Sequence, residues 1–133
     1  MTDQPLRITR VVLVGHCVPD SALLKGLVQK CLGPVPIERV NESAGLAGAT
    51  TPATLWLVNR VLDGSFEADS GLELIRRTAA GPNAPRLILV SNFPDAQAAA
   101  LAAGALPGFG KKALGAAATP GLLQQAAGIA AGS

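Results

Sequence analysis

The sequence predicts an α/β domain in which a parallel sheet is covered by helices on both faces. The first observation is that residues 11–14 and 87–90 are apolar at every position, which is typical of strands buried on both faces. The second is that apolar residues at helical spacing separate the strand-like segments. The third is that strands and helices alternate along the chain, as parallel strands require, because each needs a crossover connection.

Four strands and a weaker fifth are predicted. Residues 11–14 (VVLV), 55–58 (LWLV) and 87–90 (LILV) are continuous apolar runs. Residues 37–40 (IERV) alternate between apolar and charged side chains, which predicts an edge strand that partly faces water. Residues 106–109 (LPGF) are the weakest candidate, because proline and glycine both disfavour a regular strand.

The first helix is expected between the first two strands. Asp20 and Ser21 are its predicted N-cap residues, and Gly33 is its expected end. Its apolar face would contain Leu23, Leu24, Leu27, Val28, Cys31 and Leu32.

The later helices follow the same reasoning. A short helix is expected over residues 43–48, and a longer one over the segment in which Leu72, Ile75 and Ala79 share a face. Asp95 is the predicted cap of an alanine-rich helix, and Thr119, which precedes a proline, is the predicted cap of the last one. The buried face of the last helix would contain Leu122, Leu123, Ala126 and Ile129.

Five strand–helix units joined by right-handed crossovers form a three-layer α/β/α sandwich. We therefore predict a five-stranded doubly wound parallel sheet with the flavodoxin-like strand order 2-1-3-4-5. A length of 133 residues suits one domain. We expect a single domain over residues 1–133, with residues 1–8 as an N-terminal tail and residues 131–133 as a C-terminal tail.

Composition excludes several classes of protein. The chain is 49% hydrophobic and 15% charged, with a net charge of +2, which excludes a disordered chain and does not favour nucleic-acid binding. Two cysteines cannot form a disulfide framework. No apolar run approaches the roughly 20 residues of a membrane helix, and the run that begins at Val11 is too short for a signal peptide. We expect a cytoplasmic protein with no membrane contact.

A functional site is expected where the carboxyl ends of the strands meet. In a doubly wound sheet, ligands bind at that edge, near the strands at which the order reverses. The residues that follow the predicted strands there are Gly15, His16, Cys17, Asn59, Ser91, Lys111 and Lys112.

Each of these residues has a functional and a structural interpretation. His16 would bind a metal with Cys17, act as a base or take part in phosphotransfer; alternatively, it is a loop side chain bonded to the backbone. Cys17 and Cys31 are roughly 15 Å apart along the predicted helix, which is too far for a disulfide. Asn59 and Ser91 are binding groups or polar ends of strands. The lysine pair forms a small anion site or is simply solvated. Gly15 either allows another backbone segment to approach closely or forms a tight turn.

The order and spacing of these segments resemble the receiver domain of bacterial response regulators. The resemblance covers nearly the whole chain. It rests above all on the helix GLELIRR at residues 71–77, and on the hydroxyl-ended strand at 87–91 with the alanine- and glycine-rich turn that follows. No catalytic motif of the family is intact.

The resemblance implies a set of site residues. In the family, two acidic residues after the first strand hold Mg²⁺, and an aspartate at the end of the third accepts a phosphoryl group. By position, Ser91 matches the family's hydroxyl, Lys112 its lysine and Phe109 its switch aromatic. The acidic pair falls on Gly15 and His16, or on His16 and Cys17, and the phosphoacceptor falls on Asn59. The proline after the lysine is Ala113, and the loop at residues 60–70 is longer than usual.

These departures indicate a degenerate pseudo-receiver. Mg²⁺ prefers carboxylate oxygens, and an asparagine amide is a poor nucleophile. Asp63 and Asp69, in the long loop, are the only carboxylates that we expect could substitute. We therefore expect no metal, no cofactor and no enzymatic activity.

Two functions follow. The first is a signal-transduction module of a two-component phosphorelay that binds another signalling protein. A homodimer would form through its charge-poor region at residues 96–129, which corresponds to the fourth-helix to fifth-helix face. The alternative is a small-ligand or thiol-based sensor or catalyst that uses His16 and Cys17.

Overall fold

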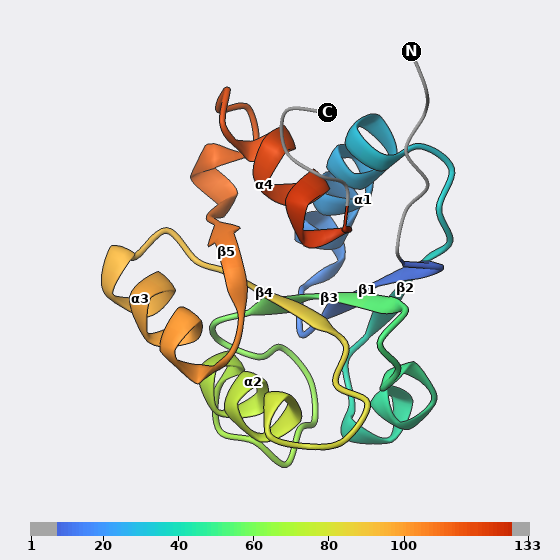
Figure 1. The fold of residues 1–133 in the computed structure, drawn as a ribbon, viewed down its shortest axis with the longest axis vertical. Helices are drawn as coiled ribbons and strands as arrows, with labels where there is room; N and C mark the ends of the chain where they lie inside the picture. Colours follow the sequence, from blue (N-terminus) through green and yellow to red (C-terminus); the bar gives the residue numbers. More distant parts are fainter. Residues whose placement is uncertain (1–7, 129–133) are drawn as a thin grey trace.

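Five parallel strands form the central sheet of the computed structural model, which describes residues 8–128 (Figure 1). Their order is β2-β1-β3-β4-β5, so the predicted flavodoxin-like topology is confirmed. The strands are β1 (Arg10–Val14), β2 (Ile37–Val40), β3 (Thr54–Asn59), β4 (Arg86–Val90) and β5 (Leu106–Phe109). The helical elements are α1 (Val18–Leu32), η1 (Ser43–Ala49), α2 (Gly71–Ala79), α3 (Pro94–Ala103), η2 (Lys111–Ala113) and α4 (Thr119–Ala126), where η1 and η2 are 3₁₀ helices.

The weakly predicted fifth strand forms, but with an irregularity. Ile88 of β4 pairs with Leu106, and Val90 pairs with Phe109, so β5 gains one residue relative to β4 between these two pairs. Pro107 and Gly108 lie within this interval. Proline lacks the N–H that a regular ladder needs, and an extra residue at an edge strand accommodates it.

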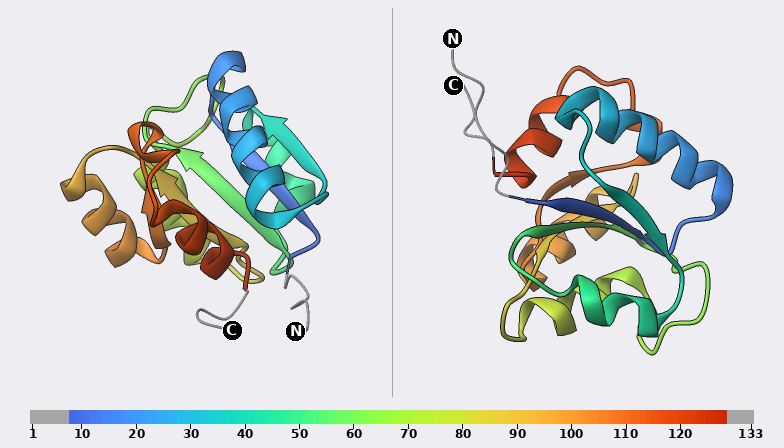
Figure 2. Two further views of the ribbon diagram at one scale, coloured as in Figure 1. Left: turned by 90° about the horizontal axis from the view of Figure 1, so that it is seen from above. Right: turned by 90° about the vertical axis from the view of Figure 1, so that its right-hand side faces the viewer.

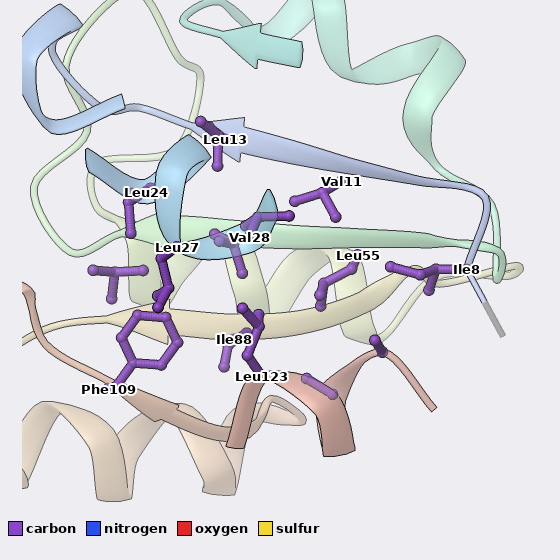
Figure 3. Close-up of a cluster of buried hydrophobic side chains, with 14 residues drawn as sticks. Ile8, Val11, Leu13, Leu24, Leu27, Val28, Leu55, Ile88, Phe109 and Leu123 are labelled. Atoms are coloured by element: carbon purple, nitrogen blue, oxygen red, sulfur yellow. The ribbon is translucent and has the colours of Figure 1, made fainter. Parts of the chain in front are cut away.

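Helices cover both faces of the sheet, as expected for strands that are apolar throughout (Figure 2). On one face, α1 and α4 pack over side chains from all three central strands and β5 (Figure 3). This core includes Leu13, Leu24, Val28, Leu55, Ile88, Phe109 and Leu123. On the other face, α2, α3 and η1 pack over Val12, Val14, Trp56, Val58, Leu87 and Leu89.

The helix starts differ from the predicted ones at three places. Cys17 is the N-cap of α1 and Asp20 lies in its first turn; Phe93 is the N-cap of α3 and Asp95 lies in its first turn. Thr119 is the first residue of α4 rather than its cap. The cause is the same each time: a proline stands at one of the first two helical positions, where no N–H donor is needed. The N-cap predictions are therefore wrong.

Two further sequence expectations are corrected by burial. Leu23, predicted on the apolar face of α1, is 58% exposed. Ile8, predicted to end the N-terminal tail, is buried in the core beneath α1 and α4. Ile129 and the predicted C-terminal tail lie outside the described residues. Within residues 8–128, no helix is long and apolar enough to span a bilayer.

Candidate functional site

The carboxyl ends of β3, β4 and β5 meet at one edge of the sheet, as predicted. A pocket of about 160 Å³ opens there. It is lined by Asn59, Arg60, Val61, Val90, Ser91, Asn92, Phe93 and Lys111. The fold thus brings together three of the chain positions that the sequence singled out, Asn59, Ser91 and Lys111.

The lysine in this pocket is Lys111, not Lys112. The Nζ of Lys111 lies 2.6 Å from Oδ2 of Asp20 and 3.4 Å from Oδ1 of Asn59. The side chain of Lys112 is exposed, and its backbone N–H donates to Oδ1 of Asn92 at 3.0 Å. The assignment of Lys112 to the site is therefore corrected: η2 begins at Lys111, so the first lysine after β5 stands beside the strand ends.

Asp20 is a site residue that sequence reasoning missed. Because Pro19 starts α1 early, Asp20 lies in the first turn of the helix and faces Lys111. The hydrogen bond from Lys111 lowers the pKa of Asp20, with a smaller contribution from the Cys17 thiol. The sequence does contain a signal for this position: a proline favours the first turn of a helix, so Pro19 indicates that the helix begins before Asp20.

The two carboxylates that were expected to substitute do not reach the pocket. Asp63 lies 3.8 Å from a guanidinium nitrogen of Arg39, and its backbone carbonyl accepts from Asn41. Asp69 is exposed. Neither lines the pocket.

The Asn59 side chain is fully engaged by its neighbours. Its Nδ2 group donates to the carbonyl of Gly15 at 2.9 Å and to that of Val61 at 2.7 Å. Its Oδ1 accepts from Lys111. Asn59 thus ties the ends of β1 and β3 together. This arrangement fits the interpretation of Asn59 as the polar end of a strand.

Both interpretations of Gly15 hold at once. Its φ is +75°, a backbone conformation that residues other than glycine rarely adopt. A Cβ there would lie 2.6 Å from Cδ2 of Leu62 and 3.1 Å from its Cα. An acidic side chain at this position would have to displace the loop at residues 60–70.

His16 does not face the crevice. Its side chain is fully buried, and Nε2 lies 2.8 Å from the carbonyl oxygen of Leu57. Because a carbonyl only accepts, Nε2 carries the proton in this contact. Burial lowers the pKa of His16 from 6.5 to about 4. The expectation that His16 stands at the crevice is wrong, and the interpretation as a side chain bonded to the backbone fits the structure.

The remaining sequence-derived residues are Ser91, Phe109, Cys17 and Cys31. The Oγ of Ser91 accepts from the N–H of Phe93 at 3.2 Å, which stabilises the turn after β4. Phe109 is buried in the core beneath α1 and α4 (Figure 3). Cys17 and Cys31 are both half-buried and free. Burial raises the pKa of the Cys31 thiol.

The pocket residues do not fit the Mg²⁺ ion that the resemblance implies. In the part of the chain that the structure describes, Asp20 is the one carboxylate that contacts the pocket lysine, and its charge is already balanced by the ammonium of Lys111. The amide oxygen of Asn59 faces the same ammonium. Among residues 8–128, no three His, Cys, Asp or Glu side chains gather where a metal ion could bind. Mg²⁺ is commonly bound through one or two unpaired carboxylates with phosphate and water.

The buried His16 predicts a pH-dependent stability. The unfolded chain binds a proton near pH 6.5, whereas the folded chain resists it down to about pH 4. The contribution of the neutral His16 to the free energy of unfolding is therefore fully present above pH 6.5. It falls by about 3 kcal/mol as the pH drops from 6.5 to about 4. Urea unfolding of the wild type and of His16→Gln between pH 7.5 and 4 measures this. The advantage of the wild type should shrink toward low pH; a constant difference would contradict the prediction.

The Lys111–Asp20 pair predicts which lysine controls the Asp20 carboxyl. Replacing Lys111 with methionine removes the donor that lowers the pKa of Asp20, so this pKa should rise toward its ordinary value. Lys112→Met, a matched change one residue away, should leave it unchanged. Carboxyl chemical shifts followed by NMR across a pH titration give the measurement. Equal effects of the two variants would refute the assignment of Lys111.

Comparison with known proteins finds similar solved structures. No protein-family model matches the chain, and no curated protein sequence matches it. The signal receiver domain of a DNA binding response regulator protein (merR) from Colwellia psychrerythraea 34H matches with a TM-score of 0.58 and 14% identity, over 79% of this chain and 86% of that one. A response regulator from Colwellia psychrerythraea matches with a TM-score of 0.56 and 22% identity, over 77% and 82%. The chain has the fold of response regulator receiver domains.

Proposed function

We propose that the chain is a non-enzymatic signalling module that is not phosphorylated and that acts by binding another signalling protein. The observation that carries this proposal is Asn59 at the end of β3, where the resemblance places a phosphoacceptor aspartate. A neutral amide is a poor nucleophile. Both polar atoms of this amide also have partners within the fold.

The Lys111–Asp20 ion pair supports the same proposal. It joins the start of η2, just after β5, to the first turn of α1, beside the edge of the sheet that in a phosphorylated receiver would hold Mg²⁺ and a phosphoryl group. Here the two side chains neutralise each other. The similar structures are described as a signal receiver domain and a response regulator, which favours a role in signal transduction. We also propose that the protein is located in the cytoplasm.

The surface formed by α3, β5 and α4 is the proposed contact for a partner or a second copy. Between residues 96 and 128 the chain carries no charged side chain except Lys111 and Lys112. On α3, the exposed residues include Ala98, Ala99, Leu101 and Ala102, and Leu101 is 48% exposed. The low charge of this surface, together with the exposed alanines and Leu101 of α3, is the basis of the proposed protein–protein contact.

The absence of a phosphoacceptor is tested with a small phosphodonor. After incubation with acetyl phosphate and Mg²⁺, intact-mass spectrometry should show no added phosphoryl group, because Asn59 cannot form an acyl phosphate. A receiver domain with an intact acidic site, treated in parallel, provides the positive control. A stoichiometric adduct that hydroxylamine removes would contradict the proposal.

The homodimer is tested by placing a charge on α3. Ala99→Glu should convert a dimer to a monomer in light scattering at high protein concentration, because burying an unpaired carboxylate in the contact is costly. Ala22→Glu, at an exposed position of α1, is the matched control and should leave the dimer intact. A wild-type chain that is monomeric at high concentration would dispose of the dimer.

A further inference from the structure

A second and larger hollow lies on the sheet face that η1 and α2 cover, away from the strand-end pocket. Its volume is about 470 Å³, within the range of sites that bind small molecules. We call it the η1–α2 groove. It is lined by Ser43, Leu46, Ala47, Thr50, Trp56, Glu67, Ala68, Leu74, Arg77, Thr78, Gly81 and Pro82.

The groove exists because a short 3₁₀ helix connects β2 to β3. The sequence of η1, SAGLAGA, contains one large apolar side chain, Leu46. Figures 1 and 2 show η1 and α2 beside each other beneath the sheet. Small side chains on η1 leave space between these two elements, and Trp56 of β3 forms part of the lining.

The fold holds the walls of the groove in place. The Oγ of Ser43 accepts from the backbone N–H of Glu67 at 2.9 Å, and the N–H of Ser43 donates to the carbonyl of Ser65 at 3.0 Å. The indole N–H of Trp56 donates to the carbonyl of Ala49 at 3.0 Å. Because these bonds tie η1 to both the loop before α2 and the sheet, the groove is formed before any ligand arrives.

Arg77 provides the positive charge at this groove, and Glu67 is the carboxylate among the lining residues. Glu73 is shared by two arginines: its Oε1 accepts from Nε of Arg77 at 2.9 Å, and its Oε2 accepts from Nε and Nη2 of Arg76. Two guanidinium groups thus face one carboxylate. Among residues 8–128, the Nη groups of Arg77 have no hydrogen-bond partner, and these donors match a carboxylate in geometry.

We propose that the η1–α2 groove binds a small carboxylic acid with an apolar body. The apolar body lies against Leu46, Trp56 and Leu74, and the carboxylate accepts from Arg77. The exposed carboxylate of Glu67, which also lines the groove, repels a ligand carboxylate and favours an orientation in which the charged end of the ligand stays on the Arg77 side. This inference does not depend on the proposed protein-binding function, because its residues lie outside both the strand-end pocket and the α3–β5–α4 surface.

Trp56 reports binding directly. It is the single tryptophan, and the chain contains no tyrosine, so fluorescence excited at the red edge of the indole band comes from Trp56 alone, a buried side chain (1% exposed) that borders the groove. We use octanoate as the probe and 1-octanol as its uncharged analogue, since neither absorbs in this range. Octanoate should change the Trp56 emission saturably with one site per chain, and 1-octanol should bind about tenfold more weakly because it lacks the charge-assisted bonds to Arg77.

Two matched pairs of variants locate the site. Arg77→Gln should weaken octanoate binding about tenfold, whereas Arg76→Gln, which removes the other partner of Glu73 but does not line the groove, should change it less than about twofold. Ala47→Phe should fill the groove and abolish binding of both probes. Ala44→Phe, also exposed on η1 but outside the lining, should leave binding intact. Circular dichroism checks that each variant folds.

The outcomes separate the proposal from its rivals. Loss of affinity in Arg77→Gln and Ala47→Phe, with Arg76→Gln and Ala44→Phe unaffected, supports a carboxylate site in the groove. Equal affinity for octanoate and 1-octanol, or equal effects of the two arginine variants, would overturn the role of Arg77. A fluorescence change that does not saturate, or that Ala47→Phe leaves intact, would overturn the site itself.

Discussion

The burial of β1, β3 and β4 on both faces is the constraint on which the rest of the structure depends. Side chains such as Val12, Leu55 and Leu89 have no exposed surface, so each strand needs cover above and below. Parallel crossovers supply that cover and place all strand ends at one edge. The position of the polar pocket therefore follows from how the apolar strands are buried, and not from any affinity among the polar residues themselves.

Within that pocket, the polar groups of Asn59 and Lys111 have partners in the fold. Asn59 bonds to two backbone carbonyls, and Lys111 is held by Asp20 and by the Asn59 oxygen. The Gly15 backbone also packs closely against Leu62, so the loop at residues 60–70 occupies space that an acidic side chain would need. Charge balance and steric closure thus act together, and no carboxylate is among the residues that line the strand-end pocket in the described part of the chain.

The strand-end pocket and the η1–α2 groove differ in physical character for a structural reason. The strand-end pocket is bordered by the termini of strands, where backbone groups leave the ladder and polar side chains meet them. The η1–α2 groove lies along the side of the sheet, where its surface is apolar and small residues on η1 leave it incompletely covered. The first is polar and internally paired, whereas the second is mostly apolar with uncommitted guanidinium donors at Arg77.

The sequence alone predicted the five strands, because apolar runs and helical spacing are local patterns that burial enforces directly, and the rules for parallel crossovers and doubly wound sheets then gave the strand order and the edge at which a site would lie. It also indicated the polar end of β3 at Asn59. Only the tertiary structure decided which lysine enters the pocket, that Asp20 meets it, and that His16 turns into the interior. Lys111 and Asp20 are 91 residues apart, so their contact depends on the bulge in β5 and on the early start of α1 at a proline. Such small shifts in register and helix start move a side chain into or out of a site, and no local pattern records them.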